Sequence, residues 1–266
     1  MTEPVSAKSA WPTTDEVKEA LLTGTGEGIK IAVIDSGVEF DHPKLANMIA
    51  GDSIGLAEDD GRIEIIEGAG TDVYGHGTGV AGIIHELAPK ATIGSFRVLD
   101  ARSLSRTNLI YAGVKEAIKR GYHILNCSFG CRGLAKFILP HKAWADEAWL
   151  TGIHVVAACS NNDDSEAEWP SHFSSVISVN IARSETDDIY HRPGKLVSFS
   201  ARGENVEVAW LGGATQCQTG TSFAAPRISA ALSRILSVYP EVPPPIMKAL
   251  LAEVSEPWRD DLNSEW

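Results

Sequence analysis

Three polar residues in this chain of 266 residues have the types and the order needed for nucleophilic catalysis. Asp35 ends the apolar run 31–34, His76 lies within the letters GHGTGVAG, and Ser222 lies within GTSFAAP. A serine hydroxyl becomes a good nucleophile when a base takes its proton, and a histidine base is oriented by a carboxylate. Together the three residues predict a site for acyl transfer.

Each of the three residues also has an ordinary structural explanation when it is taken alone. Asp35 fits a carboxylate that caps the turn before Gly37, and a histidine among glycines fits a loop position. Ser222 precedes a helical pattern and fits a serine N-cap. Catalysis is the stronger interpretation only because all three occur in one chain, each at the end of a predicted element.

Other short patterns give weaker signals. His42 and His85 do not have the spacing of a metal motif such as H-E-x-x-H. The glycines of GTGEG (24–28) precede the first apolar run instead of following it. A nucleotide-binding loop is therefore disfavoured, because its phosphate needs the helix N-terminus that follows the strand.

Continuous apolar runs predict the strands that position these residues. Such runs are typical of a parallel sheet that helices cover on both faces. The carboxyl ends of the strands in such a sheet are where ligands bind, and Asp35 lies at one of these ends. The predicted strands are 31–34, 93–99, 123–128, 153–158 and 176–181.

Helical patterns lie between and after the strands. Apolar residues recur at helical spacing from 110 to 118, and Gly121 stands where a C-terminal cap belongs. The same spacing runs from 228 to about 238, with Pro226 expected in the first turn, where amides have no helical partner. Three prolines open a last helix at 246–254. Strands alternating with helices predict the α/β fold class.

The chain is interpreted as one domain with short terminal additions. Residues 1–25 form an N-terminal segment packed on the domain, 26–256 the α/β domain, and 257–266 a C-terminal tail. The segments 52–71 and 162–168 are acidic or contain glycine, so we expect exposed loops there.

Composition limits the class of function. Hydrophobic residues make up 44% and charged residues 22%, which is ordinary for a globular protein, and the net charge of −12 disfavours nucleic acid as a partner. No apolar run approaches the roughly 18 residues that span a membrane, and the N-terminus lacks a secretory signal pattern. Four cysteines form no disulfide framework. With Met1 as the natural start, we expect a cytoplasmic protein without a membrane partner.

The order Asp35, His76, Ser222 and the segments around these residues resemble the subtilisin-like serine proteases. The resemblance covers about residues 26–254. It implies the family's fold, a three-layer sandwich with a mainly parallel central sheet covered by helices on both faces. It also implies a serine endopeptidase acting through an acyl-enzyme. The further segments that carry it are DHPKL (41–45), LAPKA (87–91), ILNCSFG (124–130), VVAACSN (155–161), WP (169–170), VISV (176–179) and VSFS (197–200).

The resemblance assigns a role to each catalytic candidate. Ser222 would attack the scissile carbonyl, His76 would act as general base and then acid, and Asp35 would hold the imidazole. The oxyanion would be stabilised by the Asn161 side chain and the Ser222 backbone N–H. Asn162 is the alternative donor, because the Asn-Asn pair leaves the alignment uncertain by one residue.

The substrate would bind as an extended peptide. The resemblance implies that Ser128, Phe129 and Gly130 offer backbone for strand addition, with core packing as the alternative role of Phe129. Glu168 falls where the family has the floor of its primary pocket, and three further carboxylates, Asp163, Asp164 and Glu166, are close in sequence. A carboxylate there would favour Lys or Arg before the cleaved bond; the alternative is an acidic solvated loop.

Calcium commonly stabilises this family, yet no loop of the chain shows a fixed calcium spacing, so no metal is assigned and no cofactor is required. The carboxylates available to Ca²⁺ are Asp41, Asp52, Asp59, Asp60 and Asp72.

The start of the chain bears on activation. Asp35 lies only 34 residues from Met1, so no folding-assistant segment is expected before it. The enzyme folds unaided, or it is an excised domain, or a separate activator or inhibitor chain acts on it. We therefore expect an intracellular processing or regulatory protease with a peptide or protein substrate. The alternatives are a catalytically silent binding or scaffold domain and a peptide ligase or macrocyclase that uses the same acyl-enzyme.

Overall fold

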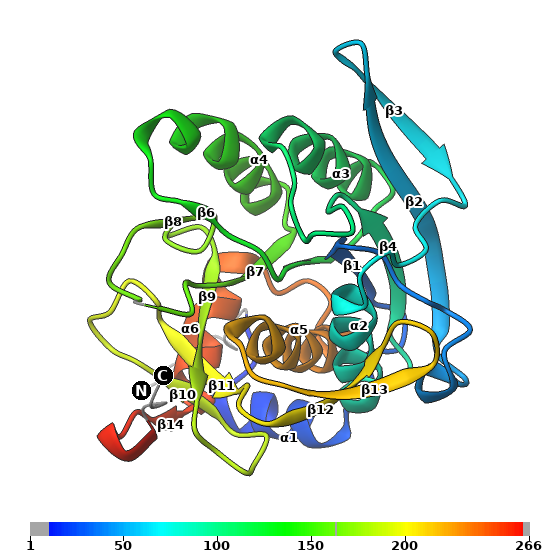
Figure 1. The fold of residues 1–266 in the computed structure, drawn as a ribbon. Coiled ribbons are helices and arrows are strands. Elements are labelled where there is room, and N and C mark those ends of the chain that lie inside the picture. The colour runs from blue at the N-terminus through cyan, green and yellow to red at the C-terminus, as the bar shows by residue number, and fades with distance from the viewer. Residues whose placement is uncertain (1–10, 163, 263–266) are drawn as a thin grey trace, which may run out of the picture.

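The computed structural model describes residues 11–162 and 164–262. Its centre is a ten-stranded sheet in the order β14-β10-β11-β9-β7-β5-β1-β4-β2-β3 (Figure 1). The middle strands are parallel to one another, as their continuous apolar sequences predict. These strands are β1 (Lys30–Asp35), β4 (Thr92–Arg97), β5 (Ile124–Cys127), β7 (His154–Ala158) and β9 (Ile177–Ala182).

The outer strands of the sheet include two antiparallel neighbours. On one side β11 (Phe199–Arg202) continues the parallel order, and β10 (Ile189–His191) runs antiparallel to it before β14 (Glu256–Pro257). On the other side β2 (Ile49–Asp59) is parallel to β4, and β3 (Arg62–Glu67) returns antiparallel to β2. The chain switches sides of the sheet between β1 and β5, and ligands of such sheets bind at that place.

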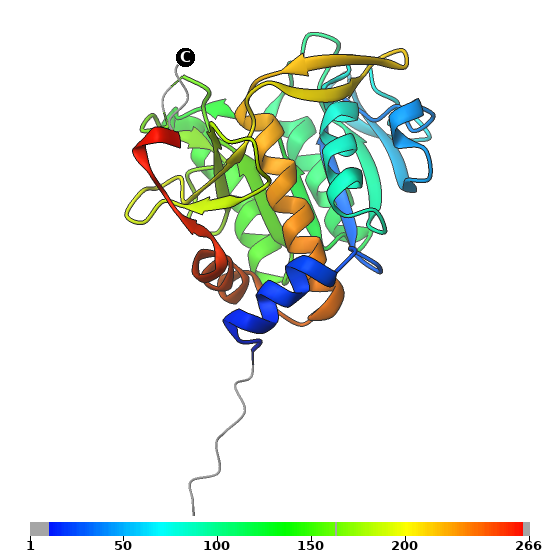
Figure 2. The same cartoon turned by 90° about the horizontal axis from the view of Figure 1, so that it is seen from below.

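Helices cover both faces of the sheet (Figures 1 and 2). One face packs against α3 (Thr107–Lys119) and α4 (Ile138–Leu150). The other packs against α2 (His76–Leu87) and α5 (Thr221–Val238), with α1 (Thr14–Thr23) and α6 (Pro244–Val254) outside them. Alternate residues of β1 enter the two cores: Ile31 and Val33 face α2 and α5, whereas Ala32 and Ile34 face α3 and α4.

Short elements complete the fold. Two small sheets lie apart from the main one, β12 (Val206–Trp210) with β13 (Ala214–Gln218), and β6 (Cys131–Arg132) with β8 (Glu168–Trp169). The 3₁₀ turns are Pro43–Leu45, Ala135–Phe137 and Asp260–Leu262. No helix in the ranges 11–162 and 164–262 has the length and apolar character needed to cross a membrane.

The prediction of an exposed loop at 52–71 is largely wrong, because most of these residues form the β2–β3 hairpin. Asp60 and Gly61 make its turn with φ values of 46° and 74°. Asp-Gly with both φ positive is a strong hairpin signal. The acidic composition misled the prediction because β3 is an edge strand whose side chains are largely exposed.

The helix expected to start near 228 begins at Thr221. Ser222 therefore lies in its first turn, and Pro226 lies one turn further in, not in the first turn as expected. The missing amide of Pro226 would have bonded to the carbonyl of Ser222, four residues earlier. The Ser222 carbonyl is therefore free to accept a hydrogen bond from a donor outside the helix.

The two ends of the described chain pack on the domain. Val17 and Ala20 of α1 are buried, and Val17 belongs to the core that α5 and α6 share. In the expected tail, Leu262 is buried beside Ala182 and Tyr190. Residues 1–10 and 263–266 of the expected terminal segments lie outside the described residues.

Candidate active site

Neighbouring strands bring the predicted residues to one edge of the sheet. Asp35 is the last residue of β1, Ser128 follows β5, and Asn161 comes three residues after β7. These three strands are adjacent and parallel, so their carboxyl ends meet. His76 opens α2 and Ser222 lies in the first turn of α5, and the two helices lie side by side (Figures 1 and 2).

The structure brings Asp35 and His76 into direct contact. His76 Nδ1 lies 2.8 Å from Asp35 Oδ1, and the aspartate is fully buried. Burial alone would lower the pKa of His76, but the charge and hydrogen bond of Asp35, helped by the charge of Asp72, raise it above its usual value. The imidazole ring also packs against Phe223, with 5.3 Å between ring centroids. The histidine is thus oriented on one side by a charge and on another by a ring.

A second buried carboxylate, Asp72, shapes the loop that carries His76. Its Oδ1 accepts hydrogen bonds from Ser36 Oγ at 2.8 Å, Tyr74 N at 2.9 Å and Gly75 N at 2.8 Å. Its Oδ2 accepts from Thr78 N at 2.9 Å and from Thr78 Oγ1 at 2.6 Å. Asp72 therefore joins the end of β1 to the first turn of α2 and acts as a positioning residue for His76.

Ser222 and Ser128 are linked in both directions. Ser222 Oγ donates to the Ser128 carbonyl at 3.2 Å, and Ser128 Oγ donates to the Ser222 carbonyl at 3.0 Å. The second bond uses the carbonyl that Pro226 leaves without a helical amide. The proline inside α5 thus creates an acceptor that ties the first turn of α5 to the end of β5.

The Asn161 side chain is anchored through its oxygen. Asn161 Oδ1 accepts from Thr221 N at 2.8 Å and from Thr221 Oγ1 at 3.0 Å, and Thr221 Oγ1 also lies 2.7 Å from the Cys159 carbonyl. With the oxygen held this way, the amide nitrogen is the group available as a donor. The alternative residue is Asn162. Its backbone N donates to Ser160 Oγ at 3.2 Å, and the residue lines a neighbouring cavity.

The predicted substrate-binding segment lies beside a carboxylate. Ser128 is buried, Phe129 packs partly into the α3–α4 core, and Gly130 is exposed. Glu168 in β8 lies next to Gly130: a Cβ added there would approach the Glu168 carboxyl carbon to 2.3 Å. Asp163, considered with Glu168, lies outside the described residues.

The carboxylates considered for Ca²⁺ do not come together. Asp52 pairs with Arg120, Asp72 serves the His76 loop, and Asp59 and Asp60 lie at the tip of the β2–β3 hairpin. Asp41 is exposed. Across the part of the chain that the structure describes, no group of three or more His, Cys, Asp or Glu residues could hold a metal ion.

Sequence reasoning missed several supporting residues. Asp72 was considered only as an oxygen ligand for calcium, and Thr221 and Phe223 were quoted only as part of a motif. The available signal was an acid, Asp72, four residues before a histidine among glycines, since backbone amides at a helix start need a hydrogen-bond acceptor. The contacts of Thr221 and Phe223 depend on tertiary packing and gave no such signal.

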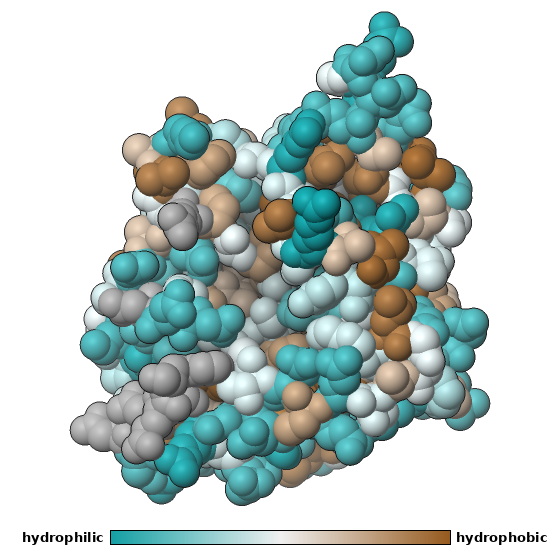
Figure 3. Space-filling view, viewed as in Figure 1, coloured by the Kyte–Doolittle hydropathy of each residue, from teal (hydrophilic) through white to brown (hydrophobic). Residues whose placement is uncertain are grey.

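The surface over this edge is mixed in character. Figure 3 shows the face on which α5 begins, and apolar side chains lie there in several small groups among polar ones. Among the exposed apolar residues nearest to the catalytic candidates in sequence is Tyr74, whose ring meets that of Trp210 edge-on at 5.7 Å. A surface of this mixed character suits a bound peptide, because the peptide has a polar main chain and individual apolar side chains.

Comparison with known families decides the assignment. The profile of the Subtilase family, Peptidase_S8, matches residues 26–261. The chain belongs to the subtilase family. The resemblance to subtilisin-like serine proteases drawn from the sequence is thereby confirmed.

Individual relatives of this subtilase are moderately similar to it. Subtilisin E of Bacillus subtilis (strain 168) is 30% identical over 81% of this chain. The alignment covers 57% of subtilisin E, so the chain spans little more than half the length of that relative. The Major intracellular serine protease of the same organism is 31% identical, over 80% of this chain and 69% of that protein. The Minor extracellular protease Epr of Bacillus subtilis (strain 168) is 32% identical, over 86% of this chain and 34% of that protein.

Solved structures confirm the predicted fold. A cold adapted subtilisin-like serine proteinase superposes with a TM-score of 0.70 at 21% identity, covering 86% of this chain and 83% of the other. Sphericase superposes with a TM-score of 0.68 at 22% identity, covering 88% of this chain and 87% of the other. The α/β sandwich expected from the sequence is therefore correct.

Proposed function

We propose that this subtilase is a serine endopeptidase in which Ser222 attacks the scissile carbonyl and His76 takes the serine proton. The observation that carries the proposal is the 2.8 Å contact between buried Asp35 and His76 Nδ1. Because Asp35 engages Nδ1, the proton chemistry is assigned to Nε2. The raised pKa of His76 means that its charged form, which arises when it accepts the serine proton, is favoured.

The oxyanion would be stabilised by two donors. Asn161 Oδ1 is held by Thr221, which supports Nδ2 as one donor, and the backbone N–H of Ser222 is the second. Ser222 lies in the first turn of α5, where amides have no helical partner and the helix dipole favours negative charge. Loss of such an asparagine costs about 10²–10³ in rate, a value that comes from subtilisin itself.

A peptide substrate would lie along the segment Ser128–Gly130 and pair with its main chain. Ser222 Oγ already lies 3.2 Å from the Ser128 carbonyl, so a peptide bound there would carry a carbonyl close to the nucleophile. The hydroxyl would exchange this bond for one to His76 when substrate binds, since catalytic hydrogen bonds often tighten only in the complex.

The test is labelling with a fluorophosphonate, read by intact mass. One adduct, mapped to Ser222, is expected on wild type and on the control Ser198→Ala. Ser222→Ala should give none, and His76→Ala should label at least about 10²-fold more slowly, as expected on loss of the general base. An adduct that persists in Ser222→Ala would contradict the proposal. No adduct on folded wild type would favour a silent scaffold domain or the need for a separate activator chain.

The proposed reaction needs no cofactor, since each group in it is a side chain or a backbone amide. Labelling in excess EDTA is therefore expected to proceed at the wild-type rate. A loss of labelling that Ca²⁺ restores would instead show that a metal ion maintains the site. Parallel peptide assays with and without an added amine separate hydrolysis from ligation, because a ligase would transfer the acyl group to the amine.

We further propose an intracellular processing or regulatory role, with a peptide or protein as partner. Two observations support it: one relative is named as an intracellular serine protease, and the four cysteines are unpaired, as in a reducing compartment. Immunodetection of the native chain in cell lysate and in medium tests it. Accumulation in the medium, as the name of the extracellular relative suggests for that protein, would contradict it.

A further inference from the structure

We propose that a cavity between α1, α5 and β14 binds a free α-amino acid with an apolar side chain. The carboxylate and ammonium groups of this ligand would insert into the ion pair between Arg227 and Asp187. The cavity is separate from the candidate active site, because Asp35, His76, Asn161 and Ser222 do not line it. The inference therefore goes beyond the proposed peptidase function and does not depend on it.

The cavity has a volume of about 340 Å³, which is enough for a small molecule. Five parts of the chain that are far apart in sequence form it. They are the end of α1, the end of α2, the middle of α5, the start of β10 and the junction of α6 with β14. Figure 2 shows these elements gathered around α5. The shape of the cavity thus follows from the packing of the fold and not from one loop.

Part of the cavity wall is apolar. Leu21, Leu87, Ile189 and Val254 line it and are half-buried, and Ala231 is buried. An aliphatic side chain placed against them would leave water, and the gain grows with the apolar area that is covered. The wall therefore favours a ligand with an aliphatic side chain over one without.

Arg227 supplies a cation in the cavity. Its side chain is only 6% exposed, and its Nη1 pairs with Asp187, whose side chain is 53% exposed. Arg227 Nε is buried and has no hydrogen-bond partner among the residues that the structure describes. Burial lowers the pKa of Arg227, since the charged form has lost water, and the charge of Glu86 opposes this change. A guanidinium has several N–H donors, so its pairing with one exposed aspartate can be exchanged for a ligand carboxylate.

Arg234, on the same face of α5, has a structural role instead. Its Nη1 donates to the Leu87 carbonyl at 3.2 Å and its Nη2 to the Leu22 carbonyl at 2.8 Å. These carbonyls lie in the last turns of α2 and α1, where a positive charge is stabilising. Arg234 therefore fixes two helix ends at the cavity, which leaves Arg227 as the cation for a ligand.

The rim of the cavity carries carboxylates that suit an ammonium group. Asp187, Asp188 and Glu256 line the cavity and are exposed. These carboxylates would repel a simple anion, and Arg227 would repel a simple cation. A zwitterion replaces one ion pair with two and leaves the net charge of the cavity unchanged. In an α-amino acid both charged groups are attached to one carbon, so they are close enough together to enter a contact ion pair.

The test is a titration of the full chain with L-leucine, followed by NMR. Backbone amide signals of Asp188 and Ile189 report binding in every variant, and the Arg227 Nε–H signal, identified by its absence in Arg227→Met, reports the contact itself. Saturable shifts are expected in wild type and in the matched control Arg106→Met, which removes an arginine from an exposed ion pair. Arg227→Met should bind L-leucine at least about tenfold more weakly.

Matched ligands separate the contributions of the two charges and of the side chain. L-Leucinamide lacks the carboxylate, N-acetyl-L-leucine lacks the ammonium group, and glycine lacks the apolar side chain. Each should bind at least about tenfold more weakly than L-leucine. Asp187→Asn removes the carboxylate that competes for Arg227, so N-acetyl-L-leucine should bind this variant more tightly than it binds wild type.

Three results would overturn the inference. The first is the absence of a saturable shift with L-leucine in wild type. The second is equal affinity of wild type for L-leucine and L-leucinamide, which would exclude a carboxylate contact with Arg227. The third is equal affinity of wild type and Asp187→Asn for N-acetyl-L-leucine. The last two comparisons do not require Arg227→Met to fold.

Discussion

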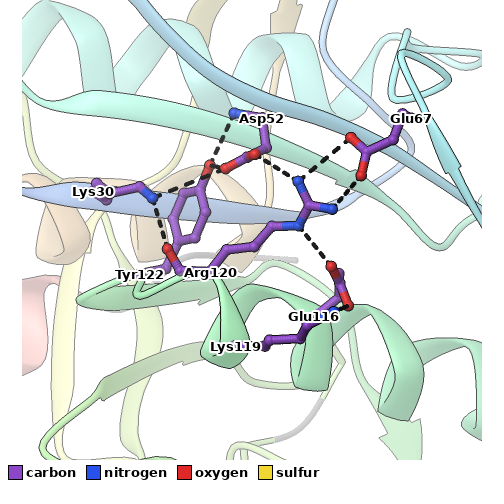
Figure 4. Close-up of polar contacts among 7 residues, drawn as sticks. All are labelled: Lys30, Asp52, Glu67, Glu116, Lys119, Arg120 and Tyr122. Atoms are coloured by element: carbon purple, nitrogen blue, oxygen red, sulfur yellow. Dashed lines mark hydrogen bonds and ion pairs between the residues drawn. The ribbon is translucent and has the colours of Figure 1, made fainter.

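Two groups of carboxylates, at opposite ends of the parallel strands, differ in the direction in which the protein shifts their pKa values. At the end where Lys30 begins β1, Arg120 holds three carboxylates (Figure 4). Arg120 Nε donates to Glu116 at 2.7 Å and Nη1 to Asp52 at 2.7 Å, and Nη2 pairs with Glu67.

At the other end, where Asp35 ends β1, Glu166 and Glu168 border the cavity that Asn162 lines. Burial raises the pKa of Glu168 to about 7, and Glu166 adds to the effect. The pKa of Asp52 is lowered, because hydrogen bonds from Tyr122 and Arg120 outweigh the cost of its burial. The difference teaches that a cation supplied by the protein lowers the pKa of a partly buried carboxylate, whereas burial beside a like charge raises it.

Removing the built-in cation should give the largest change in stability. Arg120→Met removes the nearer of the two cations of Glu116, whose side chain is only 6% exposed, and leaves it with Lys119 Nζ at 3.5 Å. Breaking a buried ion pair from one side costs about 3–5 kcal/mol, and the partial exposure of Asp52 and Glu67 reduces this to about 2–4 kcal/mol. We expect a melting temperature lower by about 5–10 °C in calorimetry. An unchanged melting temperature would contradict the role assigned to the cluster.

The same variant should lose its effect in acid. The folded pKa of Asp52 lies below its ordinary value of 3.8, so its contribution is present above that pH and disappears as the pH falls through the folded pKa. The difference in stability between wild type and Arg120→Met is therefore expected to shrink below about pH 4. Urea titrations at neutral pH and in acid test this, with Arg120→Lys as the variant that keeps the charge.

A substitution of Glu168 at the cavity is expected to raise the free energy of unfolding, whereas Arg120→Met lowers it. Since the folded pKa of Glu168 is above its ordinary value of 4.5, ionisation disfavours the folded state, and stability falls as the pH rises from about 4.5 through about 7. Glu168→Gln removes this cost. It should raise stability by about 1–2 kcal/mol at pH 8, after allowance for solvent screening, and leave it unchanged near pH 4. Equal stability of the two proteins at pH 8 would argue against a destabilising charge at Glu168.

Much of the fold could be predicted because buried parallel strands have continuous apolar sequences. The five predicted strands all occur, with ends that differ by at most two residues. The hairpin at 52–71 was missed because an exposed edge strand such as β3 carries charged residues on its surface. The start of α5 was placed seven residues late, since Pro226 was expected in the first turn, whereas Ser128 Oγ binds the carbonyl left by its missing amide one turn further in.

The candidate site could be located from the sequence, but its supporting contacts could not. Motifs around Asp35, His76 and Ser222 are local patterns, and strand ends bring such patterns together in any sheet of this kind. By contrast, the pairing of Asn161 with Thr221 joins residues 60 positions apart. The approach of Glu168 to Gly130 likewise depends on the β6–β8 pairing, for which two-residue strands leave no readable pattern.

The smallest effect is expected where a cation and a carboxylate meet in solvent. Arg106 Nη1 lies 2.8 Å from Glu58, but the Arg106 side chain is 71% exposed. Exposed pairs contribute about 0–1 kcal/mol, since water and salt screen the charges and ordering the side chains costs entropy. Arg106→Met should therefore leave the free energy of unfolding nearly unchanged, both at low and at high salt. If this loss equalled that of Arg120→Met, the number of pairs and not their burial would determine stability, and the contrast between the two carboxylate groups would lose its physical basis.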